Sequence, residues 1–204
     1  YLSGSFSPGV GASLDMAANG QPLNPSCVNL FRFYFPDFKF IEIMPENQMG
    51  IEISLFNGNG VHHFFTSEQI IPIVERCSRI WRESLSCFTS DDVQPLVETG
   101  VDGVYMHRFG GGNKHLFTVW NTNETELPSA QLNMELPEEY HAFDPINYRA
   151  LKTELVEGQM KVSLPCPSRL LAAVAVARES LSVERDGRRL NFKARAMEGR
   201  DAGE

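Results

Sequence analysis

The chain has 204 residues, of which 42% are hydrophobic, so it can bury the core of one large domain or of two modest ones. Its formal net charge of −8 disfavours a nucleic-acid-binding protein, because a phosphate backbone requires a basic surface. No apolar run is long enough to cross a bilayer, so the sequence predicts no membrane span.

The first 25 residues are rich in glycine, serine, asparagine and proline, a composition that orders only with outside support. The chain begins at Tyr1 rather than at methionine, and no signal peptide is visible. We therefore expect a C-terminal fragment of a longer protein, with this opening lying as a loop over a missing partner. Asp15 is its only charged residue and is expected to be solvated, with a catalytic role as the alternative.

The next part of the chain mixes short strands with aromatic segments. Residues 26–35 are expected to form a short helical segment that Pro36 ends, and its many aromatic side chains indicate deep burial. Residues 38–43 and 61–65 are expected to be strands. Residues 51–56 fit a strand or a helix, because periodicity does not settle six residues.

Residues 66–85 give the clearest helix. Pro72 either starts its main part or kinks it. The residues that recur near helical spacing predict an amphipathic helix packed on a sheet; they are Ile73, Cys77, Ile80, Trp81 and Ser84. We expect Trp81 in the core rather than on a ligand surface.

Residues 104–121 predict two strands joined by a tight glycine turn at residues 110–113. Alternation places Val104 and Met106 on one face and Tyr105 and Phe109 on the other. In the second strand, Leu116, Thr118 and Trp120 share a face opposite Phe117 and Val119. Such a hairpin is marginal alone, so we expect a second sheet to cover its apolar face.

Short strands with regular turns follow, at residues 131–136, 140–143, 151–156, 159–164 and 170–177, and residues 180–196 contain a further hairpin signal. This pattern predicts an antiparallel sandwich. We place a boundary in the linker at residues 87–100, where helical periodicity gives way to alternation.

No complete catalytic constellation is visible. Five carboxylates could serve a glycosidase, but nothing in their spacing shows that two converge: Asp15, Asp37, Glu42, Glu46 and Glu52. The four cysteines form no CxxC pair, so we expect buried thiols rather than a zinc site. No nucleotide, phosphate or metalloprotease motif occurs, and the sequence predicts no cofactor and no metal.

Four segments occur in an order that resembles a known group of enzymes. They are Phe31-Arg32-Phe33-Tyr34-Phe35-Pro36-Asp37, Leu55-Phe56-Asn57-Gly58, the amphipathic helix, and Arg108-Phe109 through Val119-Trp120-Asn121. Together they look like the end of a glycoside hydrolase-type (β/α)8 barrel joined to a C-terminal antiparallel β-sandwich. The likeness covers residues 25–177 and is to bacterial carbohydrate-active enzymes of the α-galactosidase-like broad group.

The resemblance implies an α+β fold in three parts. Residues 1–90 would be the incomplete C-terminal portion of a (β/α)8 barrel, residues 91–178 an antiparallel β-sandwich, and residues 179–204 a hairpin and frayed tail or the start of a further module. The principal catalytic residues would lie on barrel strands that precede Tyr1, so the fragment itself is expected to be inactive. The enzyme would act on an oligosaccharide or glycoside, in the periplasm or outside the cell.

Barrel sites form at the carboxyl ends of the strands. If residues 38–43 and 61–65 are late barrel strands, nearby polar side chains would line the sugar pocket: Asn57, Asn59, His62 and His63. Adjacent histidines on a strand face opposite ways, which argues against a shared metal.

Two other functions remain open. A carbohydrate-binding module would need exposed aromatic side chains, and Trp120, Tyr105 and Tyr140 are the candidates. A protein-interaction domain would instead use exposed apolar surface along residues 30–65.

Overall fold

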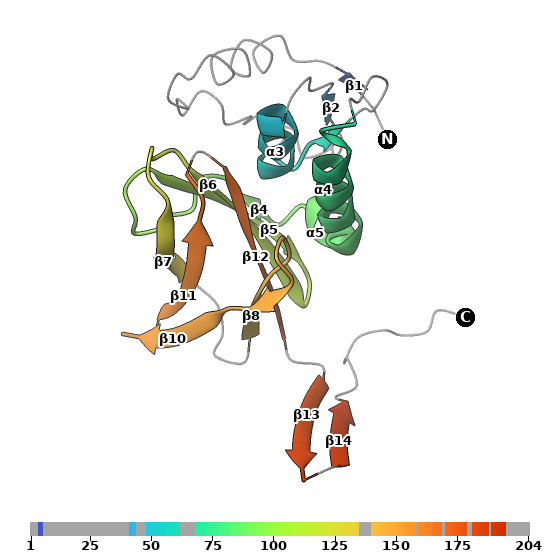
Figure 1. The fold of residues 1–204 in the computed structure, drawn as a ribbon, viewed down its shortest axis with the longest axis vertical. Coiled ribbons are helices and arrows are strands. Elements are labelled where there is room, and N and C mark those ends of the chain that lie inside the picture. Colours follow the sequence, from blue (N-terminus) through green and yellow to red (C-terminus); the bar gives the residue numbers. More distant parts are fainter. Residues whose placement is uncertain are drawn as a thin grey trace, which may run out of the picture.

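The structure is a computed structural model that describes residues 4–5, 41–43, 48–61, 68–134, 140–157, 159–168, 170–178, 181–187 and 189–194 (Figure 1). Strands in antiparallel sheets are the main secondary structure of the described chain. The described residues form three helices beside these sheets: α3 (Gln48–Phe56), α4 (Ile71–Glu83) and α5 (Leu85–Phe88). No described helix is long and apolar enough to span a membrane.

The largest sheet has six antiparallel strands in the order β4-β5-β6-β12-β8-β9. These strands are β4 (Val93–Gln94), β5 (Val104–Gly111), β6 (Lys114–Asn121), β12 (Leu171–Arg178), β8 (Tyr140–Asp144) and β9 (Arg149–Ala150). A second antiparallel sheet has the order β10-β11-β7, with β10 at Lys152–Val156, β11 at Gln159–Cys166 and β7 at Leu127–Met134.

The predicted central hairpin is confirmed. β5 pairs with β6 from Val104 opposite Asn121 to Gly111 opposite Lys114, which leaves a two-residue turn. Gly112 opens this turn with a φ of 72°, a conformation that glycine adopts without strain. β6 also pairs with β12 and β5 also pairs with β4, so the hairpin lies inside the sheet rather than at its edge.

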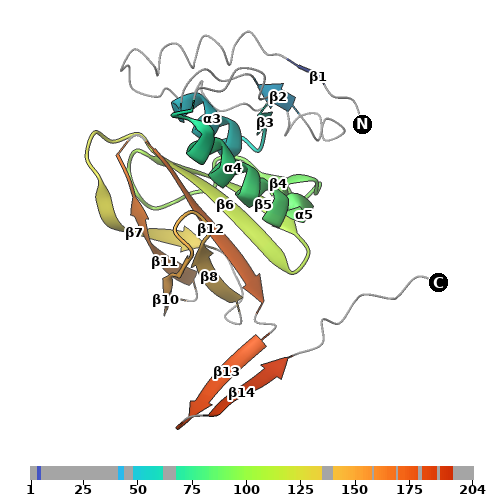
Figure 2. The ribbon, with the colours of Figure 1, turned by 45° about the vertical axis from the view of Figure 1, so that its right-hand side comes forward.

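The six-stranded sheet buries both of its faces. One face packs on the second sheet, and this core includes Met106, Phe117 and Val119 together with Leu132 and Val162. The other face packs on the helices through side chains that include Phe109, Leu116, Trp120, Ile51 and Ile80. The expected alternation of the hairpin is therefore confirmed, but a second sheet covers only one side of it. Figure 2 shows the helices on the opposite side.

The two longer helices, α3 and α4, differ in how they are buried. Residues 50–56 are all buried, including the polar Glu52 and Ser54, and they form a helix rather than a strand. The expected amphipathic helix is confirmed as α4, which carries Pro72 in its first turn and buries Ile73, Cys77 and Ile80.

Three very short strands form a separate parallel sheet in the order β1-β2-β3. They are β1 (Gly4–Ser5), β2 (Ile41–Ile43) and β3 (Gly60–Val61). The expected strands at residues 38–43 and 61–65 are described only at these positions, and the expected helical segment at residues 26–35 lies outside the described residues.

The last two described strands form a separate two-stranded sheet. β13 (Leu181–Asp186) and β14 (Arg189–Ala194) form the hairpin expected within residues 180–196. β11 continues through Cys166 although Pro165 lies within it. A register shift between Leu164 and Cys166 absorbs Pro165, which has no N–H to donate to a neighbouring strand.

Candidate functional site

Two of the four predicted sugar-contacting residues, Asn57 and Asn59, occupy the turn between α3 and β3. Asn57 is buried, and its Nδ2 donates to the Ile53 carbonyl over 3.0 Å at the end of α3. Asn59 is 1% exposed, and its side-chain amide has no hydrogen-bond partner among the described residues. Both asparagines precede β3. His62 and His63 lie outside the described residues, so sugar contact by the four side chains stays a prediction.

Glu52 is the candidate carboxylate whose side chain the structure describes. It is buried between α3 and β12, and burial raises its pKa. Its Oε2 accepts from the Leu171 backbone N–H over 3.2 Å, and its Oε1 accepts from Gln48 Nε2 over 3.0 Å. These contacts give Glu52 a structural role that joins the helix to the sheet.

The aromatic residues proposed as a sugar-binding surface are not exposed side by side. Trp120 is 2% exposed and belongs to the core beneath the helices, while Tyr105 and Tyr140 are half-buried. Residues 51–56 are buried as well, so this part of the suggested apolar interaction surface does not exist. Trp81 stacks on Phe88 with ring centroids 4.8 Å apart, as expected for a core residue.

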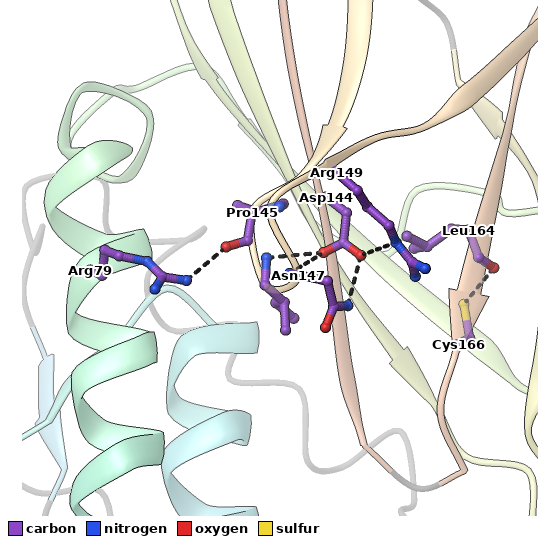
Figure 3. Close-up of polar contacts among 8 residues, drawn as sticks. Arg79, Asp144, Pro145, Asn147, Arg149, Leu164 and Cys166 are labelled. Atoms are coloured by element: carbon purple, nitrogen blue, oxygen red, sulfur yellow. Dashed lines mark hydrogen bonds and ion pairs between the residues drawn. The ribbon is translucent and has the colours of Figure 1, made fainter.

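The clearest built arrangement of polar groups is the turn between β8 and β9. The Asp144 carboxylate is buried and accepts four hydrogen bonds within this turn (Figure 3). Its Oδ1 accepts from the backbone N–H groups of Ile146 and Asn147 over 2.9 and 3.1 Å. Its Oδ2 accepts from Asn147 Nδ2 over 2.8 Å and from Arg149 Nε over 3.1 Å. One carboxylate therefore fixes the whole turn.

The same turn docks on α4. Arg79 Nη2 donates to the Pro145 carbonyl over 3.1 Å (Figure 3). The Arg79 guanidinium also lies 4.0 Å from the ring centroid of Tyr148, a cation–π contact. The Tyr148 hydroxyl donates to Glu83 Oε1 over 3.0 Å. We call this set of contacts the α4 clasp; it comprises Arg79, Glu83, Pro145 and Tyr148.

Further contacts hold the helices against β5 and β6. Thr118 Oγ1 donates to the Phe56 carbonyl at the end of α3 over 2.7 Å. Lys114 Nζ donates to the Glu83 carbonyl at the end of α4 over 2.8 Å. Phe88 of α5 packs against Phe109 with ring centroids 5.0 Å apart. All three helices are thus tied to β5 and β6 by polar or aromatic contacts.

His107 lies buried in the interface between the helices and the sheet. It is fully buried, its ring lies 4.2 Å from the Phe56 ring, and its Nδ1 accepts from the Leu96 backbone N–H over 3.0 Å. Burial lowers the pKa of His107 to about 3, so the imidazole is neutral at physiological pH. Cys77, Cys87 and Cys166 are free and buried, as expected, and Cys27 lies outside the described residues.

Sequence reasoning missed the α4 clasp. Tyr148 and Glu83 are 65 residues apart, and no helical or alternating pattern connects positions so distant. The sequence predicted a turn after residues 140–143, but it did not indicate which helix this turn contacts. Among the described residues, no group of three or more histidine, cysteine or acidic side chains could hold a metal ion.

No protein-family model matches the sequence, and no curated protein matches it either. Similar solved structures are carbohydrate-active enzymes. An α-amylase from H. orenii is 10% identical with a TM-score of 0.53, over 87% of this chain and 49% of that chain. A GH30 endoxylanase from Clostridium papyrosolvens C71 is 13% identical with a TM-score of 0.48, over 87% and 48%. A cyclomaltodextrin glucanotransferase, CldA, is 10% identical with a TM-score of 0.49, over 83% and 40%.

The chain thus spans less than half the length of each of these enzymes. At such low identity, the likeness to the α-amylase extends to the fold alone.

Proposed function

We propose that this chain is the C-terminal region of a glycoside hydrolase-like enzyme, in which the antiparallel sandwich supports the end of a catalytic barrel. One observation carries the proposal: the six-stranded sheet buries one face against the second sheet and the other against α3, α4 and α5. An antiparallel sandwich that stands alone leaves its outer faces to solvent. A sheet whose outer face is apolar can instead pack against the helices of another domain.

The order of the N-terminal elements supports a barrel end. β2, α3, β3 and α4 follow one another along the chain, and β2 and β3 are parallel neighbours. Alternation of parallel strands and helices is the repeating unit of a (β/α)8 barrel. We accordingly propose residues 1–90 as the barrel portion, residues 91–178 as the sandwich and residues 179–204 as a hairpin and tail or a further module.

We further propose that the catalytic acid and base lie on strands that precede Tyr1, and that Asn57, Asn59, His62 and His63 contribute polar contacts to a sugar. The buried amide of Asn59 supports this, because an unpaired buried amide carries a penalty of about 1–3 kcal/mol unless another group meets it. The α-galactosidase-like group is the proposed relative.

The test is an activity assay of the isolated 204-residue chain on a panel of aryl-glycosides. We expect no turnover above the buffer rate. The control is the same chain extended upstream along its reading frame, which is expected to hydrolyse one of the substrates. Turnover by the isolated chain that a single substitution such as Glu52→Gln abolishes would contradict the proposal.

A second test addresses the proposal that the sandwich supports the helices of the barrel portion. Hydrogen exchange followed by mass spectrometry is expected to show α3 and α4 opening together with β5 and β6, because they share one core. Phe109→Ala removes a side chain from the helix-facing core, and Phe117→Ala is the matched change in the core between the sheets. The first variant is expected to lose protection in α4 and α5 preferentially. Equal losses from both variants would contradict the support role.

A further inference from the structure

Tyr148 has a backbone conformation that aromatic residues rarely adopt. Its φ is 52°, in the left-handed region where glycine and asparagine are the usual residues. A bulky side chain at such a position carries a strain of roughly 1–2 kcal/mol. Backbone strain of this kind persists only where the surrounding structure holds the residue, so it draws attention to the Tyr148 side chain.

The α4 clasp holds this side chain but does not bury it. Arg79 lies against the ring and Glu83 binds the hydroxyl, yet 51% of Tyr148 remains exposed. Phe143 is 36% exposed, and its ring centroid lies 6.0 Å from that of Tyr148 at an interplanar angle of 64°. The two rings therefore form one aromatic corner on the surface, and one of them is fixed before any ligand arrives.

Exposed polar side chains lie beside this corner. Glu83 accepts from the Tyr148 hydroxyl, and Asn147 precedes Tyr148 in the turn. Arg149 pairs with Asp144 in the β8–β9 register, so its side chain lies on the other face of the sheet from Phe143. The Glu83 carboxylate therefore stands as an acceptor next to the apolar rings.

A pyranose ring matches this combination, because it presents an apolar C–H face and a rim of hydroxyl groups. We propose that the aromatic corner of Phe143 and Tyr148 binds a neutral oligosaccharide, with the sugar ring against the aromatic rings and its hydroxyls toward Glu83. This proposal rests on the proposed function for the class of ligand. The site is non-catalytic and would hold a polymeric substrate on the enzyme surface.

Preorganisation makes the site effective despite its small size. A fixed ring loses little side-chain entropy on binding, whereas a free surface tyrosine would have to be ordered by the ligand itself. The strained φ of Tyr148 is what carries the ring from the turn to α4, so the strain and the binding surface have a common cause.

The experiment is NMR titration of the isotope-labelled 204-residue chain with maltoheptaose and, separately, with xylohexaose. We expect one of them to shift amide resonances within residues 143–149. Tyr148→Gly removes the ring and relaxes the backbone, and it is expected to raise the Kd about tenfold or more, in line with the loss of one stacked aromatic contact. Tyr148→Phe keeps the ring and is expected to change the Kd less than about threefold.

Leu96→Gly is the matched control. Leu96 has the same φ of 52° and is 42% exposed, so the substitution relaxes a comparable strain away from the aromatic corner. It is expected to leave the Kd unchanged. A purely structural role for Tyr148 predicts an altered Tm with unchanged affinity in Tyr148→Gly, and this result would overturn the site.

Two other results would also overturn the site. Shifts that map only to other residues would do so while leaving the proposed function intact. An absence of shifts with both sugars would do so as well, and the aryl-glycoside assay of the extended chain then decides separately whether the proposed function fails.

Discussion

The buried histidine at position 107 should make the stability of this protein depend on pH. In the folded state the pKa of His107 is lowered from 6.5 to about 3 by burial, so the unfolded chain binds a proton more readily than the folded chain. Stability therefore rises with pH between about 3 and 6.5. The contribution is fully present above pH 6.5 and is lost as the pH falls toward 3.

The size of the effect follows from the shift. Each pKa unit corresponds to about 1.4 kcal/mol, so the difference of 6.5 and about 3 gives about 5 kcal/mol when complete. Between pH 7 and pH 5, only the unfolded chain becomes protonated, and the loss is about 2 kcal/mol. A loss of that size is a large part of the stability of a typical domain.

The measurement is urea unfolding at pH 7 and at pH 5 for the wild type and for His107→Asn. Asparagine offers an oxygen in place of Nδ1 to the Leu96 N–H but cannot take up a proton. The variant is expected to be less stable than the wild type at pH 7, because it loses the packing of the ring on Phe56. Between pH 7 and pH 5, its free energy of unfolding is expected to fall by about 2 kcal/mol less than that of the wild type. A His141→Asn variant controls for removing an exposed histidine. An identical pH dependence in wild type and His107→Asn would refute the reasoning.

Three further predictions concern stability, each measured by denaturant unfolding. Asp144→Ala leaves the donors of the β8–β9 turn unmatched and is expected to cost about 2–4 kcal/mol; a change below about 1 kcal/mol would show that the turn does not depend on this carboxylate. Trp81→Phe keeps an aromatic ring against Phe88 but removes part of the ring system and the 3.1 Å hydrogen bond from Nε1 to the Asn59 carbonyl, for an expected loss of about 1–3 kcal/mol, and a neutral result would contradict both contributions. Gly112→Ala meets no atom within 4 Å and should cost only the strain at φ 72°, about 1 kcal/mol. Gly111→Ala would place its Cβ 2.8 Å from α5 backbone atoms and should cost more, about 2–3 kcal/mol; the reverse order would contradict the close approach of α5 to β5.

The local elements were determined by the sequence. Alternation in residues 104–121 predicted the strands, their faces and the glycine turn, because side chains of a strand point to opposite sides with a period of two. Helical spacing after Pro72 predicted α4 and its buried face in the same way. These features depend on neighbours within a few residues, which the sequence displays directly.

The tertiary structure alone decided what covers each face. The sequence could not assign residues 51–56 to helix or strand, since six residues are too few for periodicity to decide; the structure makes them a helix in which every one is buried, Glu52 and Ser54 included. Nor could it show that Arg79 and Glu83 meet the turn at Pro145 and Tyr148, because a contact between distant positions leaves no periodic trace. The packing of the helices on one face of the sheet, on which the proposed function rests, is therefore a property of the folded chain that the sequence does not display.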